Sequence, residues 1–326
     1  MAAAPTRPLL TCYLDPPAVP DEAATAGDRS GDHSADDRID LTGTTWSTWV
    51  AKTVNLLLEL GGVEGGSGAP VLLRLPPHWQ TAVWTEAALR LGARVTLDLR
   101  TGREVAGRSG GDPDGLPVPA PGEWAVVAYD RAGDDAANSD DAAERFFLPL
   151  LAMNAPGTLS ARSSALGAWD YAAEVSAFGD RYALPPRVAE RAAAAARLTT
   201  RGGDPVTEPH TGDGSNRDGA GLGGPGPGLG AGGREGDALD GARLVAAADA
   251  RATAAGLGAG GRLLATGWGV GGPFLDLLAA ARRGGSVVLA PDADSLDAAQ
   301  AQRRWAAERV TATAPRAPSG SLGPRG

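Results

Sequence analysis

The chain of 326 residues carries the same pattern of apolar segments and glycines twice. In each copy a candidate helix leads through a glycine-rich turn into an apolar strand, and a second helix and a second strand follow. Gly241 corresponds to Gly43 at an offset of 241 − 43 = 198, and Gly284 to Gly92 at 284 − 92 = 192. Strands that alternate with helices form parallel sheets with helices on their faces. The repeat therefore predicts an α/β protein with duplicated helix-strand-helix-strand lobes, whose stacked, mostly parallel sheets have flanking helices and share a helical layer.

The first copy opens with a helix that we expect over residues 42–60. Its apolar residues recur at helical spacing, a threonine is available as N-cap, and Gly61-Gly62 marks the end. Trp46 and Trp49 are expected in the core. Lys52 lies at a different angle around the same helix, so we expect it to face solvent.

Further elements follow from apolar runs and from the Gly and Pro residues that bound them. We expect strands at 8–14, 38–41, 71–75, 94–99, 123–129 and 262–266, helices at 78–91, 168–178, 187–197 and 273–283, and a strand or short helix at 144–153.

Composition divides the chain into two lobes. Loop-like stretches rich in Asp, Gly, Pro and Ser have too few apolar residues to pack, and the Gly/Pro-rich insertion is expected to be disordered. The expected divisions are a first α/β lobe at 1–197 with loop insertions at 15–37, 100–122 and 130–141, the disordered insertion at 198–237, a second α/β lobe at 238–314 and a disordered tail at 315–326.

The charge and cysteine content exclude several classes of protein. The formal net charge is −9, and the arginines are dispersed among acids, which argues against nucleic-acid binding. No apolar run reaches the roughly 20 residues that a membrane span requires. Cys12, the one cysteine, is expected in a buried strand and fits a reducing compartment. These features indicate a cytoplasmic protein without membrane or nucleic-acid partners, and they leave a protein partner or a homo-oligomer open.

A glycine-rich turn in the second copy matches a dinucleotide-binding pattern. Gly267, Gly269 and Gly272 satisfy G-x-G-x-x-G after a strand and before a helix, and Asp292 lies 292 − 272 = 20 residues further on. Such a turn can place backbone N–H groups at a pyrophosphate and a carboxylate at a ribose hydroxyl. The same pattern recurs at 228–233 and 256–261 without a preceding strand, so an ordinary strand-to-helix turn is the competing interpretation.

His78, Trp79 and Gln80 form the candidate ligand-binding turn of the first copy. They follow the strand at 71–75, where open α/β sheets present groups that contact ligands. Capping or packing of the helix start is the competing role for His78. The three histidines and one cysteine offer no structural zinc site, so no metal site and no catalytic residue is predicted.

Several segments resemble adenylate-forming enzymes, the AMP-binding superfamily that includes acyl-CoA synthetases. Residues 42–99, which contain LRLGARVTLD at 89–98, look like the opening of their N-terminal domain, and residues 261–291 resemble a later part of it. More closely, the chain resembles a small uncharacterised actinobacterial family with distant similarity to these enzymes. The segments that carry this closer resemblance are LLTCYLD, WVAKTVNLLLELGG, LPPHWQT and DYAAEVSAFGDRY.

The departures from that superfamily determine the expected function. Where the relatives carry an S-G-T-T-G-x-P-K phosphate loop, the region between Arg197 and Gly241 is glycine-rich and has no lysine. Nothing like the later Y-G-x-T-E or T-G-D motifs, or the C-terminal lysine-bearing domain, follows Ala314. Losing one charged contributor to adenylation commonly costs on the order of a thousandfold in rate.

We therefore expect an AMP-binding-enzyme-like protein that lacks ligase activity and acts as a ligand-binding, regulatory or assembly module. ATP or AMP is the cofactor that the resemblance implies. A first alternative is a ligase-like enzyme that binds ATP or an acyl-adenylate with arginines in place of lysines, or with a partner domain. A second alternative is a dinucleotide-binding protein that uses the turn at 267–272.

Overall fold

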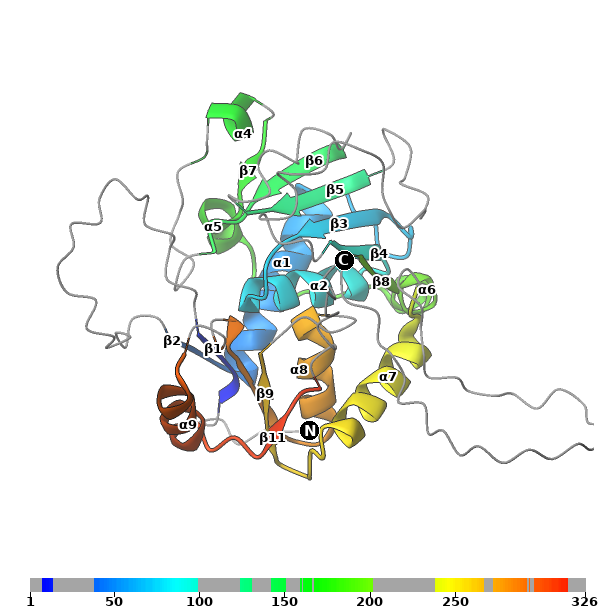
Figure 1. Ribbon diagram of the computed structural model, residues 1–326. Coiled ribbons are helices and arrows are strands. Elements are labelled where there is room, and N and C mark those ends of the chain that lie inside the picture. Colours follow the sequence, from blue (N-terminus) through cyan, green and yellow to red (C-terminus); the bar gives the residue numbers. More distant parts are fainter. Residues whose placement is uncertain are drawn as a thin grey trace, which may run out of the picture.

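Two β-sheets face each other across a layer of helices (Figure 1). The computed structural model describes residues 8–13, 38–98, 124–130, 142–150, 159, 161–165, 167–201, 238–266, 272–291, 293 and 296–315.

The first sheet is parallel throughout its described strands. β3 lies near its centre and pairs with β4 and β5, with Val71 opposite both Val95 and Val126. The strand order is β7 (Trp169–Asp170), β6 (Ala142–Phe147), β5 (Trp124–Tyr129), β3 (Pro70–Arg74), β4 (Arg94–Asp98) and β8 (Arg197–Arg201).

The second sheet combines strands from both ends of the chain. β1 pairs in parallel with β10, with Leu10 opposite Val287, and β1 and β2 form the expected antiparallel hairpin. The strand order is β11 (Ala312–Thr313), β9 (Arg262–Ala265), β10 (Ser286–Leu289), β1 (Pro8–Tyr13) and β2 (Arg38–Thr42).

The helices between the sheets contribute to one core. A single cluster of buried apolar residues contains Val71 and Leu97 of the first sheet and Leu263 and Val287 of the second. Helices α2 and α8 pack against each other within this layer (Figure 1). The helices are α1 (Gly43–Glu59), α2 (Trp79–Arg90), α4 (Ala161–Ala165), α5 (Tyr171–Glu174), the 3₁₀ helix η5 (Val175–Ala177), α6 (Pro186–Ala195), α7 (Gly241–Ala254), α8 (Gly272–Arg282) and α9 (Ala298–Ala307).

The duplicated α/β fold is confirmed, and both copies have the same strand order. In the first sheet β5, β3, β4 and β8 lie side by side, and in the second β11, β9, β10 and β1 do. The N-terminal strand β1 therefore occupies the position in its sheet that β8 occupies in the other. The lobe boundaries expected from composition stay a prediction. The second sheet takes strands from both ends of the chain, since β1 and β2 lie beside β10.

Backbone hydrogen bonds repeat at matching positions. The N–H of Arg94 donates to the carbonyl of Ala69 at 2.9 Å, and the N–H of Ser286 donates to that of Gly261 at 3.0 Å. Donors and acceptors are both separated by 192 residues, since 286 − 94 = 261 − 69 = 192. The strand before α2 or α8 and the strand after it therefore pair in the same register in both copies.

Apolar spacing, caps and breakers in the sequence predicted most helices to within a few residues of the bounds seen in the structure. The Thr42 hydroxyl caps α1 by accepting the N–H of Thr45 at 3.1 Å. Cys12 is fully buried in β1, and Trp46 is buried in the core, as expected, whereas Trp49 is only partly buried against it.

Three expectations about secondary structure need correction. The helix expected at 168–178 is divided, because Trp169 and Asp170 pair with β6 as β7 before Asp170 caps α5. Residues 198–201, expected in the disordered insertion, belong to β8, where hydrogen bonding to β4 orders them. The ambiguous segment 144–153 starts as strand β6, which ends at Phe147.

Candidate functional site

The carboxyl ends of the strands in the first sheet meet at one edge, because these strands are parallel. At β3 this edge continues through Pro76-Pro77 into His78, and α2 begins at Trp79. The structure thus places the predicted residues His78, Trp79 and Gln80 at the strand-to-helix turn that the sequence indicated.

His78 is the N-cap of α2, and its imidazole is held neutral. Its Nδ1 accepts the backbone N–H of Gln80 at 3.2 Å, so the proton of the neutral ring is on Nε2. The residue is 4% exposed, and burial lowers its pKa from 6.5 to about 3. Nε2 has no hydrogen-bond partner in the described part of the chain, which leaves a buried donor at the turn.

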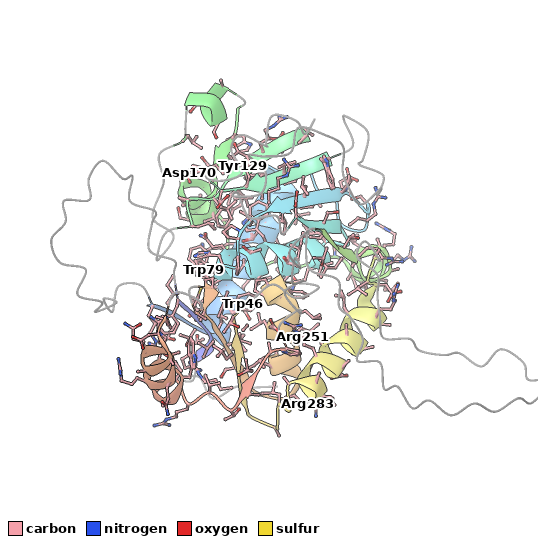
Figure 2. All side chains as sticks on the ribbon, in the orientation of Figure 1. Trp46, Trp79, Tyr129, Asp170, Arg251 and Arg283 are labelled. Atoms are coloured by element: carbon pink, nitrogen blue, oxygen red, sulfur yellow. The ribbon has the colours of Figure 1, made fainter. Side chains whose placement is uncertain are left out.

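Trp79 supplies a second buried donor beside the first. It is 1% exposed, and its indole Nε1 has no hydrogen-bond partner among the described residues. Its ring centroid lies 5.2 Å from that of Trp49 and 5.7 Å from that of His78. Figure 2 shows Trp79 between the two sheets. Gln80 is fully buried beside it, so the turn combines polar atoms with aromatic packing.

An ion pair at the same edge was missed by the sequence reasoning. Arg74 ends β3 and Asp98 ends β4, and the Arg74 Nε lies 3.3 Å from a carboxylate oxygen of Asp98. On the next strand, the hydroxyl of Tyr129 donates to the Oγ of Ser163 at 3.0 Å. The sequence shows a charged residue near the end of each of two apolar runs, but it does not show which strands become neighbours in the sheet.

Of the second predicted binding turn, the structure describes Gly272, which has a counterpart in the first turn. At the shared offset of 192 residues, Gln80 corresponds to Gly272, since 272 − 80 = 192. Gly272 begins α8 with a φ of +56°, a left-handed conformation that favours glycine. Gly267, Gly269 and Asp292 lie outside the described residues, so their role stays a prediction.

Lys52 does not face solvent freely, contrary to the expectation from its angle on α1. Its Nζ donates to the carbonyl of Phe178 at 2.5 Å and lies 2.9 Å from a carboxylate oxygen of Asp180. Its side chain is 18% exposed. The helical spacing could not reveal this arrangement, because the partners lie more than a hundred residues further along the chain.

Charged residues on the second sheet form a network that sequence reasoning also missed. Glu308 accepts hydrogen bonds from the Tyr13 hydroxyl at 2.6 Å, from Arg38 Nε at 2.8 Å and from Arg262 at 2.5 Å. Despite its burial, these donors hold the pKa of Glu308 below its usual range, whereas burial and the bond to Glu308 raise the pKa of Tyr13 to about 12. The network joins the N-terminal hairpin to the end of α9.

The part of the chain that the structure describes contains neither a candidate metal site nor a candidate membrane-spanning helix. No three His, Cys, Asp or Glu side chains come together in a way that could hold a metal ion. Among the same residues, no helix has both the length and the apolar character that crossing a membrane requires.

Comparison with known proteins gives one curated relative. No family model matches the sequence. A TIGR03089 family protein from Mycobacterium tuberculosis is 28% identical over 150 residues, which cover 46% of this chain and 52% of the relative. The chain thus matches about half the length of this curated relative.

Solved structures share the fold at low sequence identity. An acyl-CoA synthetase from Brucella canis aligns with 95% of this chain and 44% of its own, with a TM-score of 0.53 and 13% identity. The N-terminal domain of FACL13 from Mycobacterium tuberculosis, in an inhibitor-bound crystal structure, aligns with 83% of this chain and 55% of its own, with a TM-score of 0.48 and 14% identity. The chain therefore has the α/β fold of part of an acyl-CoA synthetase and is distantly similar to a mycobacterial TIGR03089 family protein.

Proposed function

We propose that the chain is an AMP-binding-enzyme-like protein without ligase activity, which binds a small ligand and acts in regulation or assembly. The observation that carries this proposal is the position of Lys52, the one lysine of the chain. Its ammonium is engaged with the backbone near Phe178 and with Asp180. Adenylation needs positive charge directed at the reacting α-phosphate, and this lysine is committed to a structural contact instead.

The proposed ligand site lies at the turn of His78, Trp79 and Gln80, with Gly267, Gly269, Gly272 and Asp292 as the equivalent candidates in the second copy. A histidine with a pKa of about 3 carries no proton to give as an acid near pH 7. Its Nε2–H remains a hydrogen-bond donor. This chemistry supports binding at the turn in preference to acid–base catalysis.

Pyrophosphate exchange tests the absence of ligase activity. The full chain is incubated with ATP-Mg²⁺, labelled pyrophosphate and carboxylic acids of different chain lengths. We expect no exchange that depends on the acid. Acid-dependent exchange by the purified chain alone would overturn the proposal.

Nucleotide titration tests the binding part separately. ATP-Mg²⁺, AMP and NAD(P) are titrated by calorimetry and by thermal shift, where a ligand at 100 times its Kd adds about 2.7 kcal/mol of stability. We expect a response to ATP or AMP that weakens in His78→Asn, a variant that keeps a capping side chain but removes the imidazole ring and its Nε2–H. A response to NAD(P) alone would favour the dinucleotide alternative, and no response at all would leave assembly as the remaining role.

The ligase-like alternative rests on the lengths of the matched proteins. Because the chain covers 44% of the acyl-CoA synthetase and 52% of the mycobacterial relative, a separate partner could supply the rest of an active site. Exchange activity that appears only after addition of a protein copurified from the source cells would support this alternative.

We also propose a cytoplasmic location. Cys12, the one cysteine of the chain, is buried in β1, which is compatible with a reducing compartment. Fractionation of the source cells, followed by immunodetection of the chain, tests this location.

A further inference from the structure

Residues 176–184, here called the strap, comprise the end of η5 and the segment that runs from it toward the start of α6 alongside α1. The strap carbonyls accept hydrogen bonds from two α1 side chains, Lys52 and Asn55. Asn55 Nδ2 donates to the carbonyls of Gly179 and Arg181 at 2.9 and 3.0 Å. Side chains of α1 thus supply donors to carbonyls at the end of η5 and in the irregular segment that follows it.

Lys52 makes three contacts with the strap, as many as an ammonium has N–H donors. Its Nζ lies 2.5 Å from the carbonyl oxygen of Phe178, 3.3 Å from that of Ser176 and 2.9 Å from Oδ1 of Asp180. Asp180 has a side chain that is 65% exposed, so the ion pair itself is weak. The contribution of Lys52 to the attachment depends mainly on the charged donor that it offers to the two carbonyls.

The strap also covers apolar surface. Phe178, Tyr182 and Leu184 are partly buried and pack against the main core. Arg90 of α2 holds Tyr182 by donating to its hydroxyl at 2.8 Å. Release of the strap would therefore bring apolar side chains beside α1 into contact with water or with a partner.

Lys52 differs chemically from the other side chains that hold the strap. Asn55 and Arg90 carry an amide and a guanidinium, which activated acyl donors do not readily modify, whereas the amine of lysine accepts acyl groups. Lys52 is also the one lysine of the chain, and its side chain is 18% exposed. A single amine thus combines the structural contact with reactive chemistry.

We propose that Lys52 is an acylation site that controls the attachment of the strap. An activated acyl donor such as an acyl phosphate transfers its acyl group to Nζ. The new N–C bond forms as the C–O bond to phosphate breaks, phosphate leaves, and the ammonium loses two protons, one to the leaving phosphate and one to solvent. The product is an uncharged amide with one N–H, which can serve one of the three former acceptors and forms no ion pair with Asp180.

Acetyl phosphate and trypsin test this proposal on the full chain. Acetylation of Lys52 and of the N-terminal amine is distinguished by peptide mass. Trypsin then cleaves after Arg181 within the strap, and the rate is measured by mass spectrometry against cleavage after Arg251 in α7. We expect acetylation of Lys52 to accelerate cleavage after Arg181 at least tenfold while cleavage after Arg251 stays unchanged, because proteases act on detached segments.

Two variants serve as controls. Lys52→Gln removes the charge without a reagent, so its strap should be cleaved about as fast as that of the acetylated chain. Lys52→Arg keeps the charge and cannot be acetylated, so acetyl phosphate should not change its cleavage rate. The proposal is overturned if Lys52 stays unmodified while the N-terminal amine reacts. It is equally overturned if acetylated Lys52 and Lys52→Gln leave cleavage after Arg181 as slow as in the untreated chain.

Discussion

Arg251 of α7 holds the carboxylate of Asp276 of α8 through both of its oxygens. Asp276 is 1% exposed at its side chain, and Arg251 is 12% exposed. In the first copy, the position 192 residues earlier is Trp84, since 276 − 84 = 192, and this residue is also fully buried. The same structural position therefore accepts either an aromatic side chain or one half of an ion pair.

This pair makes a prediction about stability. Arg251→Met should lower the free energy of unfolding by about 3–5 kcal/mol, because it leaves the Asp276 carboxylate buried without its partner. Asp276→Leu should cost less, since the remaining guanidinium still reaches water. The double variant should be more stable than Arg251→Met alone, because no buried charge is left. Urea denaturation of all four proteins gives the coupling free energy, and a double variant as unstable as the sum of its single changes would contradict this account.

The Glu308 network predicts a loss of stability in acid. Glu308→Gln should cost on the order of 3 kcal/mol at pH 7, because the buried guanidinium of Arg262 loses its charged partner. The folded-state pKa of Glu308 lies below its usual 4.5. Its contribution is therefore complete above pH 4.5 and is lost as pH falls through the folded-state pKa.

Thermal and urea unfolding between pH 7 and pH 3 measure this loss. Glu59→Gln, at an exposed position near the end of α1, is the matched control and should change stability by less than about 0.5 kcal/mol. If Glu308→Gln unfolds like the control at pH 7, the network does not stabilise the contact between the hairpin and α9.

The buried His78 predicts that stability also depends on pH between pH 5 and pH 8, above the range in which Glu308 acts. Its pKa falls from 6.5 in the unfolded chain to about 3 in the fold. Below pH 6.5 the unfolded state takes up a proton that the folded state does not, so stability falls as pH falls. At pH 5 the loss is about 2 kcal/mol relative to pH 8. His78→Asn should keep the cap and abolish this dependence in urea titrations at pH 8, 6 and 5, and an unchanged slope in that variant would exclude His78 as its source.

The sequence predicted features that depend on neighbouring residues. The helix at 42–60 and the turn at His78 follow from apolar spacing, caps and breakers, all of which act within a few residues. Lys52 was assigned to solvent because its partners at 176–180 are remote in sequence. The pairing of Arg74 with Asp98 and the place of β1 beside β10 likewise depend on the order in which strands assemble. Such contacts leave no local pattern.

A substitution at Gly92 tests the close approach of α6 to the end of α2. Its φ is +76°, and an added Cβ would lie 2.5 Å from the Cα of Ala192 and 2.6 Å from its carbonyl oxygen. Gly92→Ala should therefore combine backbone strain with a backbone clash and cost on the order of 3 kcal/mol. Gly68→Ala separates the two effects, because its φ is +69° but nothing lies within 4 Å of the added Cβ; strain alone predicts about 1 kcal/mol. Urea denaturation compares the variants, and equal losses at Gly92 and Gly68 would show that the contact with Ala192 carries no cost.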